Sequence, residues 1–157
     1  MDDYQFLKWA HIVSSTLLFG TGLGTAFHGW MAHRSGDARY AAAVGRSVVL
    51  ADWLFTAPAV VVQPVTGVLL ALTAGFPLTS SWLVAALILY ALVGACWLPV
   101  VWLQIRLHRM AEQAAASGQA LPPLFHRYAR FWFLLGWPAF LGVLLIFWLM
   151  IAKPTLW

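Results

Sequence analysis

The sequence predicts an all-α integral membrane protein, folded as a four-helix bundle with up-down topology and with both termini in the periplasm. Of its 157 residues, 62% are hydrophobic and only 9% are charged, and the mean hydropathy is +0.82. A soluble domain needs roughly 25% charged residues, whereas a lipid bilayer solvates apolar surface directly and demands only that backbone groups be paired internally. The composition therefore excludes a soluble fold and favours membrane-spanning helices.

Four hydrophobic segments are long enough to form these helices. A helix needs roughly 20 apolar residues to cross a hydrocarbon core, and the segments run over about 5–31, 47–73, 82–105 and 130–152. The chain starts MDDYQFLKWAH, which is acidic where a secretory signal is basic, so we expect the first segment to stay as a helix. No linker or repeat divides the chain, and we expect a single transmembrane domain over residues 1–157.

The distribution of positive charge predicts the orientation. The second connection, AGFPLTSS, has no charge. The first and third connections hold Arg34, Arg39, Arg46, Arg106, Arg109, Arg127 and Arg130. Because arginine and lysine are enriched in cytoplasmic loops, we expect these two connections in the cytoplasm, in a protein that crosses the bacterial inner membrane several times. The same distribution explains the net charge of +4 without a nucleic-acid partner.

The third connection, about 106–129, is expected to form a helical extension and then a short cytoplasmic loop. It begins RLHRMAEQAAASGQALPP, in which Ala, Glu and Gln favour helix. Ser117-Gly118 should end the extension, and Pro122-Pro123 should turn the chain.

Glycines mark one face of the first segment. Gly20 and Gly24 form a G-x-x-x-G pair, and Thr16 and His28 continue the same four-residue spacing. A dinucleotide loop would need G-x-G-x-x-G between a strand and a helix, which this unbroken apolar segment does not provide. The pattern instead predicts a smooth strip against which another helix, or a flat cofactor such as a porphyrin, can lie closely.

His11 is the leading candidate for a functional residue in the first segment. An ionisable side chain within a span is costly and indicates function, and Lys8 lies three residues away on roughly the same face. Two interpretations stay open: a neutral histidine hydrogen-bonded to a neighbouring helix, or a haem ligand or proton-transfer group. His28 lies seventeen residues further on, roughly 25 Å along the helix, so one metal ion cannot bind both histidines.

Prolines interrupt the second segment, LADWLFTAPAVVVQPVTGVLLAL. Pro58 and Pro64 each remove a helical hydrogen bond and favour a kink, either for packing or to open space for a ligand. The carbonyls released in this way need partners. The candidates are Thr56, Gln63 and Thr66.

Asp52 is the only acidic residue within a predicted span. We expect its carboxyl to be paired or protonated. At its expected depth, near that of His28, the available partners are His28, Arg46 and Arg106. Such a cluster is either a structural ion pair or part of a proton-relay or porphyrin-propionate environment.

Three stretches carry a resemblance to known families: LKWAHIVSSTLLFGTGLGTAF, ADWLFTAPAVVVQPVTG and WPAFLGVLLIFWLMIAKP. Over essentially the whole chain they resemble the bacterial membrane family of domain of unknown function 2269. More remotely, they are similar to the HemJ-type protoporphyrinogen oxidases and to the CopD-like copper-resistance membrane proteins. The HemJ-type resemblance implies a b-type haem with His11 as axial ligand. Corresponding motif positions are Lys8, Pro64, Gly67, Lys153 and Pro154.

The chain also departs from the HemJ-type pattern. Val84 stands where that family has a lysine in its third helix, and Gly136 and Trp137 replace an Asn-Glu pair in its fourth. These losses remove plausible proton acceptors or substrate contacts, so whether the chain is an enzyme is left open.

The leading functional hypothesis is therefore binding of haem b or a related tetrapyrrole, in a redox or tetrapyrrole-handling role. His11 would ligate the metal, and Lys8, Gly20, Gly24 and Gln63 would complete the cofactor site. One alternative is a non-enzymatic subunit of a homo-oligomer or membrane complex, associating through Gly20 and Gly24. Copper transport of the CopD-like type ranks lowest, because the spans lack a ladder of methionine and histidine ligands.

Overall fold

The computed structural model describes residues 2–157, and within that range it is helical, with no strand. Four helical rods make up the molecule. The first is α1 (Asp3–Ser35), and the second is α2 (Ala38–Ala51), which continues through the π-helical turn η1 (Asp52–Thr56) into α3 (Ala57–Thr73). The other two are α4 (Ser81–Ser117) and α5 (Pro123–Ala152). The all-helical class predicted from the composition is confirmed.

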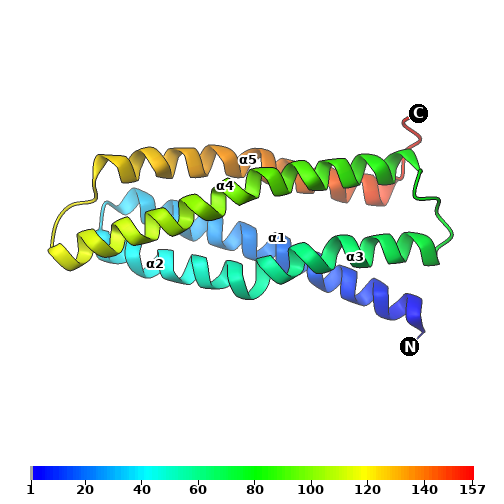
Figure 1. Ribbon diagram of the computed structural model, residues 1–157, viewed down its shortest axis with the longest axis horizontal. Coiled ribbons are helices and arrows are strands. Elements are labelled where there is room, and N and C mark those ends of the chain that lie inside the picture. Colours follow the sequence, from blue (N-terminus) through cyan, green and yellow to red (C-terminus); the bar gives the residue numbers. More distant parts are fainter. Residues whose placement is uncertain (1) are drawn as a thin grey trace.

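Figure 1 shows the rods extended along the long axis of the molecule, with both ends of the chain at the same end. We call this the terminal end, and the opposite end, where the α1–α2 and α4–α5 connections lie, the far end. Three rods are long and apolar enough to cross a membrane: Ala38–Thr73, Ser81–Ser117 and Pro123–Ala152. The α1 helix has 33 residues but is not among them. Serine, threonine, glycine and histidine lower its apolar content.

The helices extend further toward the far end than the hydrophobic segments do. Only Gly36 and Asp37 separate α1 from α2, where the sequence predicted a connection of about 32–46. Gly36 has a φ of 72°, the left-handed conformation that suits glycine and ends a helix. The Asp37 side chain accepts hydrogen bonds from the next backbone N–H groups and caps α2. Arg39 and Arg46 therefore lie on a helix.

The second rod is irregular at the π-turn η1, just ahead of Pro58, whereas Pro64, the other predicted kink position, lies inside the continuous helix α3. The Ala57 N–H donates to the Asp52 carbonyl, five residues back instead of four. Pro58 has no N–H to donate, and its ring crowds the carbonyl four residues before it, so the helix widens just ahead of the proline.

The main hydrophobic core lies toward the far end. Its largest buried members include Leu107, Phe125 and Trp132, from α4 and α5. A Cβ on Gly29 would lie 2.9 Å from the Trp132 ring, so only glycine lets α1 approach α5 this closely. A second, smaller cluster of Ala71, Trp82 and Leu83 packs α3 against the start of α4.

Candidate functional site

Four polar side chains join α1 to α3, and we call them the His11 cluster: His11, Ser14, Gln63 and Thr66. The His11 ring nitrogens Nδ1 and Nε2 lie 2.9 Å from Thr66 Oγ1 and 3.1 Å from Gln63 Nε2. Ser14 Oγ donates to Gln63 Oε1, which leaves the Gln63 amide nitrogen facing the histidine. Ser14 and Thr66 are buried, with 5% and 8% of their surfaces exposed. His11 and Gln63 are partly buried, so the cluster is a largely shielded polar contact between two helices.

Hydrogen-bond direction in this cluster assigns a neutral histidine. The Gln63 amide can only donate to His11 Nε2, so the ring proton is on Nδ1 and is donated to Thr66 Oγ1. The Thr66 hydroxyl in turn donates to the Val62 carbonyl at 2.8 Å. Each hydrogen bond of the cluster then has one donor and one acceptor, and both ring nitrogens of His11 are hydrogen-bonded. This is the hydrogen-bonded interpretation of His11 that the sequence left open.

A haem at His11 would need a different arrangement. Axial ligation requires a bare ring nitrogen, so either the Gln63 amide or the Thr66 hydroxyl would have to leave the ring. The ring also lies against α3, where a Cβ on Gly67 would meet His11 Cε1 at 3.0 Å. As arranged, these residues do not fit an iron-bound tetrapyrrole.

Gly20 and Gly24 do not share a face with His11. Nine residues at about 100° each place Gly20 half a turn away from His11 around α1. A Cβ at Gly20, Gly22 or Gly24 would have nothing within 4 Å, and Gly20 and Gly24 are exposed. The structure therefore separates the predicted ligand from the predicted strip, and one cofactor cannot contact both within a single chain.

Lys8 and the predicted motif Lys153-Pro154 lie outside the His11 cluster. Lys8 is exposed, and its ammonium lies 6.0 Å from the Tyr4 ring centroid. Lys153 lies over Phe76 at 4.5 Å, and the Pro154 carbonyl accepts a hydrogen bond from Ser81. These last contacts hold the C-terminal segment against the α3–α4 connection and the start of α4.

Asp52 forms a second buried polar group, in the π-turn. It is 6% exposed and accepts a hydrogen bond from Thr56 Oγ1 at 2.9 Å. With Gln104 of α4 it lines a cavity of about 30 Å³, whose other walls are mainly apolar and include Trp97. Sequence analysis missed Gln104 and Ser14. Ser14 could have been found from its position three residues after His11 on the same helix. Gln104 could have been found because it is the only residue with a side-chain amide in the third hydrophobic segment.

The partners predicted for Asp52 lie elsewhere. The exposed His28 Nδ1 bonds the Gly24 carbonyl of its own helix at 3.1 Å. With Ser14 opposite Gln63, the antiparallel register carries on to about Thr25 opposite Asp52, one turn short of His28. The predicted Asp52–His28 contact is therefore wrong. The Arg106 guanidinium lies 5.4 Å from the Trp102 ring centroid.

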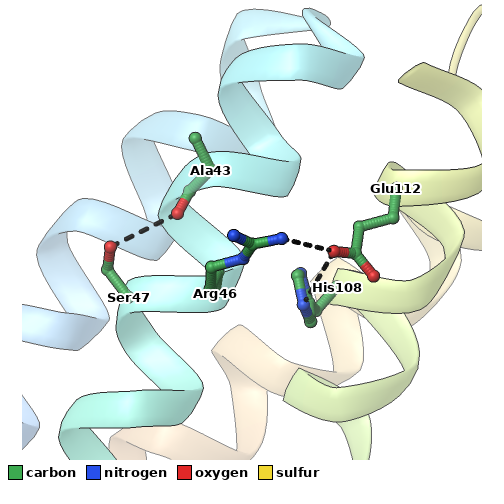
Figure 2. A network of polar contacts seen from close by, with 5 residues as sticks. All are labelled: Ala43, Arg46, Ser47, His108 and Glu112. Atoms are coloured by element: carbon green, nitrogen blue, oxygen red, sulfur yellow. Dashed lines mark hydrogen bonds and ion pairs between the residues drawn. The ribbon is translucent and has the colours of Figure 1, made fainter. Parts of the chain in front are cut away.

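Arg46 belongs to a surface network that joins α2 to α4. Figure 2 shows the Arg46 guanidinium and the His108 ring both directed at Glu112, and each contacts Oε1 at 3.4 Å. The exposed fractions of Arg46 and Glu112 are 77% and 43%. An ion pair this exposed contributes about 0–1 kcal/mol to stability, so it adds little to the contact between α2 and α4.

His33 is partly buried where α1 meets α5 at the far end, beyond the first hydrophobic segment. Its ring packs edge-on against Phe125 and Trp132, with centroids 5.4 and 5.0 Å away. Burial lowers the pKa of His33 to about 4, and the neighbouring His126 adds to the shift. His33 is therefore neutral near pH 7. Within residues 2–157, no three His, Cys, Asp or Glu side chains converge as a metal site would require.

Comparison with known proteins identifies the family. A family model described as "Predicted integral membrane protein (DUF2269)" matches residues 5–154, and the chain belongs to that family. The match confirms the resemblance to domain of unknown function 2269, and with it the integral membrane class. No curated protein and no solved structure matches the chain.

Proposed function

We propose that this protein is a non-enzymatic subunit of an assembly in the bacterial inner membrane, and that two copies associate through the glycine strip of α1. The strip comprises Thr16, Gly20, Gly24 and His28. The observation that carries the proposal is its outward position: all four residues are exposed, and a Cβ on either glycine would meet nothing within 4 Å.

Exposure of the strip to lipid would be unfavourable. Glycine leaves helical backbone uncovered, and an imidazole such as that of His28 finds no hydrogen-bonding solvent in hydrocarbon. The α1 helix is also the one rod that is not among the three long and apolar enough to be candidate spans. A protein partner that covers this face removes both difficulties.

A second copy of α1 has the required shape. Small residues four apart let two helix backbones approach closely, with van der Waals contact as the driving force in a bilayer. The large exposed side chains of Leu23 and Phe27 flank the strip and would form the rim of the contact. Copies in one membrane share an orientation, so a two-fold axis along the membrane normal brings the same strip of each together.

The arrangement in the membrane follows from charge and from the positions of the termini. Both termini lie at the terminal end, whereas the arginines lie on the helices that lead into and out of the two connections at the far end. The positive-inside tendency then supports an up-down four-helix bundle with the far end in the cytoplasm and both termini in the periplasm. The His11 cluster would lie in the periplasmic half, where it holds α1 to α3.

Substitution of Gly24 by leucine tests this function. Gly24→Leu places a bulky side chain on the strip and should shift the protein in lipid nanodiscs from dimer to monomer, measured by native mass spectrometry. Gly94→Leu is the matched control, because Gly94 is also a helix-interior glycine with open space around it, but on α4. A monomeric wild-type protein, or a Gly24→Leu variant that dimerises as well as wild type, would contradict the proposal.

Haem binding is the second candidate: the His11 ring donates its proton from Nδ1 to Thr66, so Nε2 would be the ligand, but the Gln63 amide covers Nε2 in the present arrangement. Displacement of this amide would free a ligand for haem b. The absorption spectrum separates the two candidates. A Soret band that appears on haem addition and disappears in His11→Ala would favour a tetrapyrrole role, and its absence leaves assembly as the function.

A further inference from the structure

A small cavity lies at the far end, where α1, α2, α4 and α5 meet. Its volume is about 10 Å³. Its polar walls come from His33, Gln104, His108 and Trp132, and most of the remaining lining is apolar. None of the proposed assembly contacts lies in this cavity, so the inference below does not rest on the proposed function.

Three lining residues each carry a fully shielded polar atom that has no hydrogen-bond partner among the described residues. These atoms are Gln104 Oε1, His108 Nδ1 and Trp132 Nε1. Folded proteins rarely leave such atoms unsatisfied, because each has lost its hydrogen bond to water. The clustering of three around one cavity indicates a shared ligand.

The chemistry of the three atoms identifies this ligand. The indole nitrogen of Trp132 can only donate, and the Gln104 carbonyl oxygen can only accept. His108 Nε2 lies 3.4 Å from Glu112 Oε1, which places the ring proton on Nε2 and makes Nδ1 an acceptor. The cavity therefore presents one donor and two acceptors.

We propose that one water molecule occupies this cavity, accepting a hydrogen bond from Trp132 Nε1 and donating to Gln104 Oε1 and His108 Nδ1. About 10–15 Å³ holds one water, which typically makes about three hydrogen bonds. A cation would suit the two acceptors but would be repelled by the indole N–H. The neutral His33 contributes no compensating charge.

The water would connect two polar groups that are otherwise separate. Gln104 also lines the cavity of Asp52, and His108 contacts the partly exposed Glu112 (Figure 2). The bound water and Gln104 thus continue the polar surface at the far end toward the buried Asp52 carboxyl. The water also joins α4 to α5 inside the core.

Water-edited solid-state NMR of the ¹⁵N-labelled protein in lipid bilayers tests the site. Magnetisation from water should reach the Trp132 indole N–H, and His108 Nδ1 should show the ¹⁵N shift of a hydrogen-bonded acceptor. Trp157, which is 72% exposed, serves as the positive control for transfer. Transfer to Trp157 without transfer to Trp132 would overturn the proposal.

Two variants show whether these residues hold the water. Trp132→Phe should abolish the hydrogen-bonded shift of His108 Nδ1, whereas Trp137→Phe, an exposed tryptophan on the same helix, should leave it unchanged. Gln104→Met removes an acceptor at similar volume and should abolish the transfer of magnetisation from water to Trp132. This second variant tests the site even if Trp132→Phe does not fold. An unchanged His108 Nδ1 shift in Trp132→Phe, together with unchanged water transfer to Trp132 in Gln104→Met, would overturn the assignment.

Discussion

At the scale of single residues, the His11 cluster is a polar fastening between two helices. Ser14, Gln63, His11 and Thr66 form one directed series of hydrogen bonds that ends on a backbone carbonyl. In a membrane these bonds have no water to compete with them, although measured values average only about 0.6 kcal/mol and reach about 2 kcal/mol. The cluster therefore specifies which faces of α1 and α3 meet more than it adds to overall stability.

Removal of the Gln63 amide should weaken this fastening. Gln63→Leu leaves Ser14 Oγ and His11 Nε2 without their side-chain partner. We expect a loss of about 1–2 kcal/mol in the free energy of unfolding, measured as a lower midpoint in thermal unfolding in detergent. Gln113→Leu, an exposed glutamine on α4, is the control. Equal midpoints for Gln63→Leu and wild type would show that the cluster does not hold the helices.

At the scale of helices, close approach depends on which glycines face a neighbour. Gly29 faces the Trp132 ring, which is 5% exposed and packed against His33, so the ring has little freedom to move aside. Gly22, two turns earlier on the same helix, has nothing within 4 Å. Glycine is therefore required by packing at position 29, whereas at position 22 the packing within the chain does not require it.

Substitution of these two glycines by alanine should change the stability of the protein differently. Gly29→Ala should destabilise the protein by about 1–3 kcal/mol because its methyl group overlaps the Trp132 ring. Gly22→Ala should be neutral, or stabilise by up to about 1 kcal/mol through helix propensity. Thermal unfolding midpoints decide the matter, and similar shifts in the two variants would contradict the observed α1–α5 packing.

The helical class and an irregularity at the prolines of the second rod could be predicted from the sequence, because each follows from local chemistry or composition. The first connection was predicted too long, at about 32–46, because helix ends at Gly36-Asp37 are set by capping and the hydrophobic pattern does not mark them. Partners across helices could not. Asp52 and His28 are near in depth, but depth does not give the direction in which each side chain points around its helix. His11 contacts Gln63 and Thr66 because of the register between α1 and α3, and short-range sequence patterns do not determine that register.

At the scale of the whole molecule, polar groups lie on both sides of α1. One side is satisfied within the chain by the His11 cluster, whereas the strip on the other side has no partner there. An isolated copy would expose that strip to lipid. The proposed dimer gives both sides of the helix a protein environment, which accounts for a helix less apolar than the other three rods.

Disulfide cross-linking at Gly20 tests this claim most directly. In a Cys96→Ala background, which removes the native cysteine, Gly20→Cys should form a covalent dimer when membranes are oxidised, because the two-fold axis brings position 20 of both copies together. Val61→Cys, at an exposed site on α3, should stay monomeric. A Gly20→Cys protein that remains monomeric, or that cross-links no better than Val61→Cys, would contradict the account.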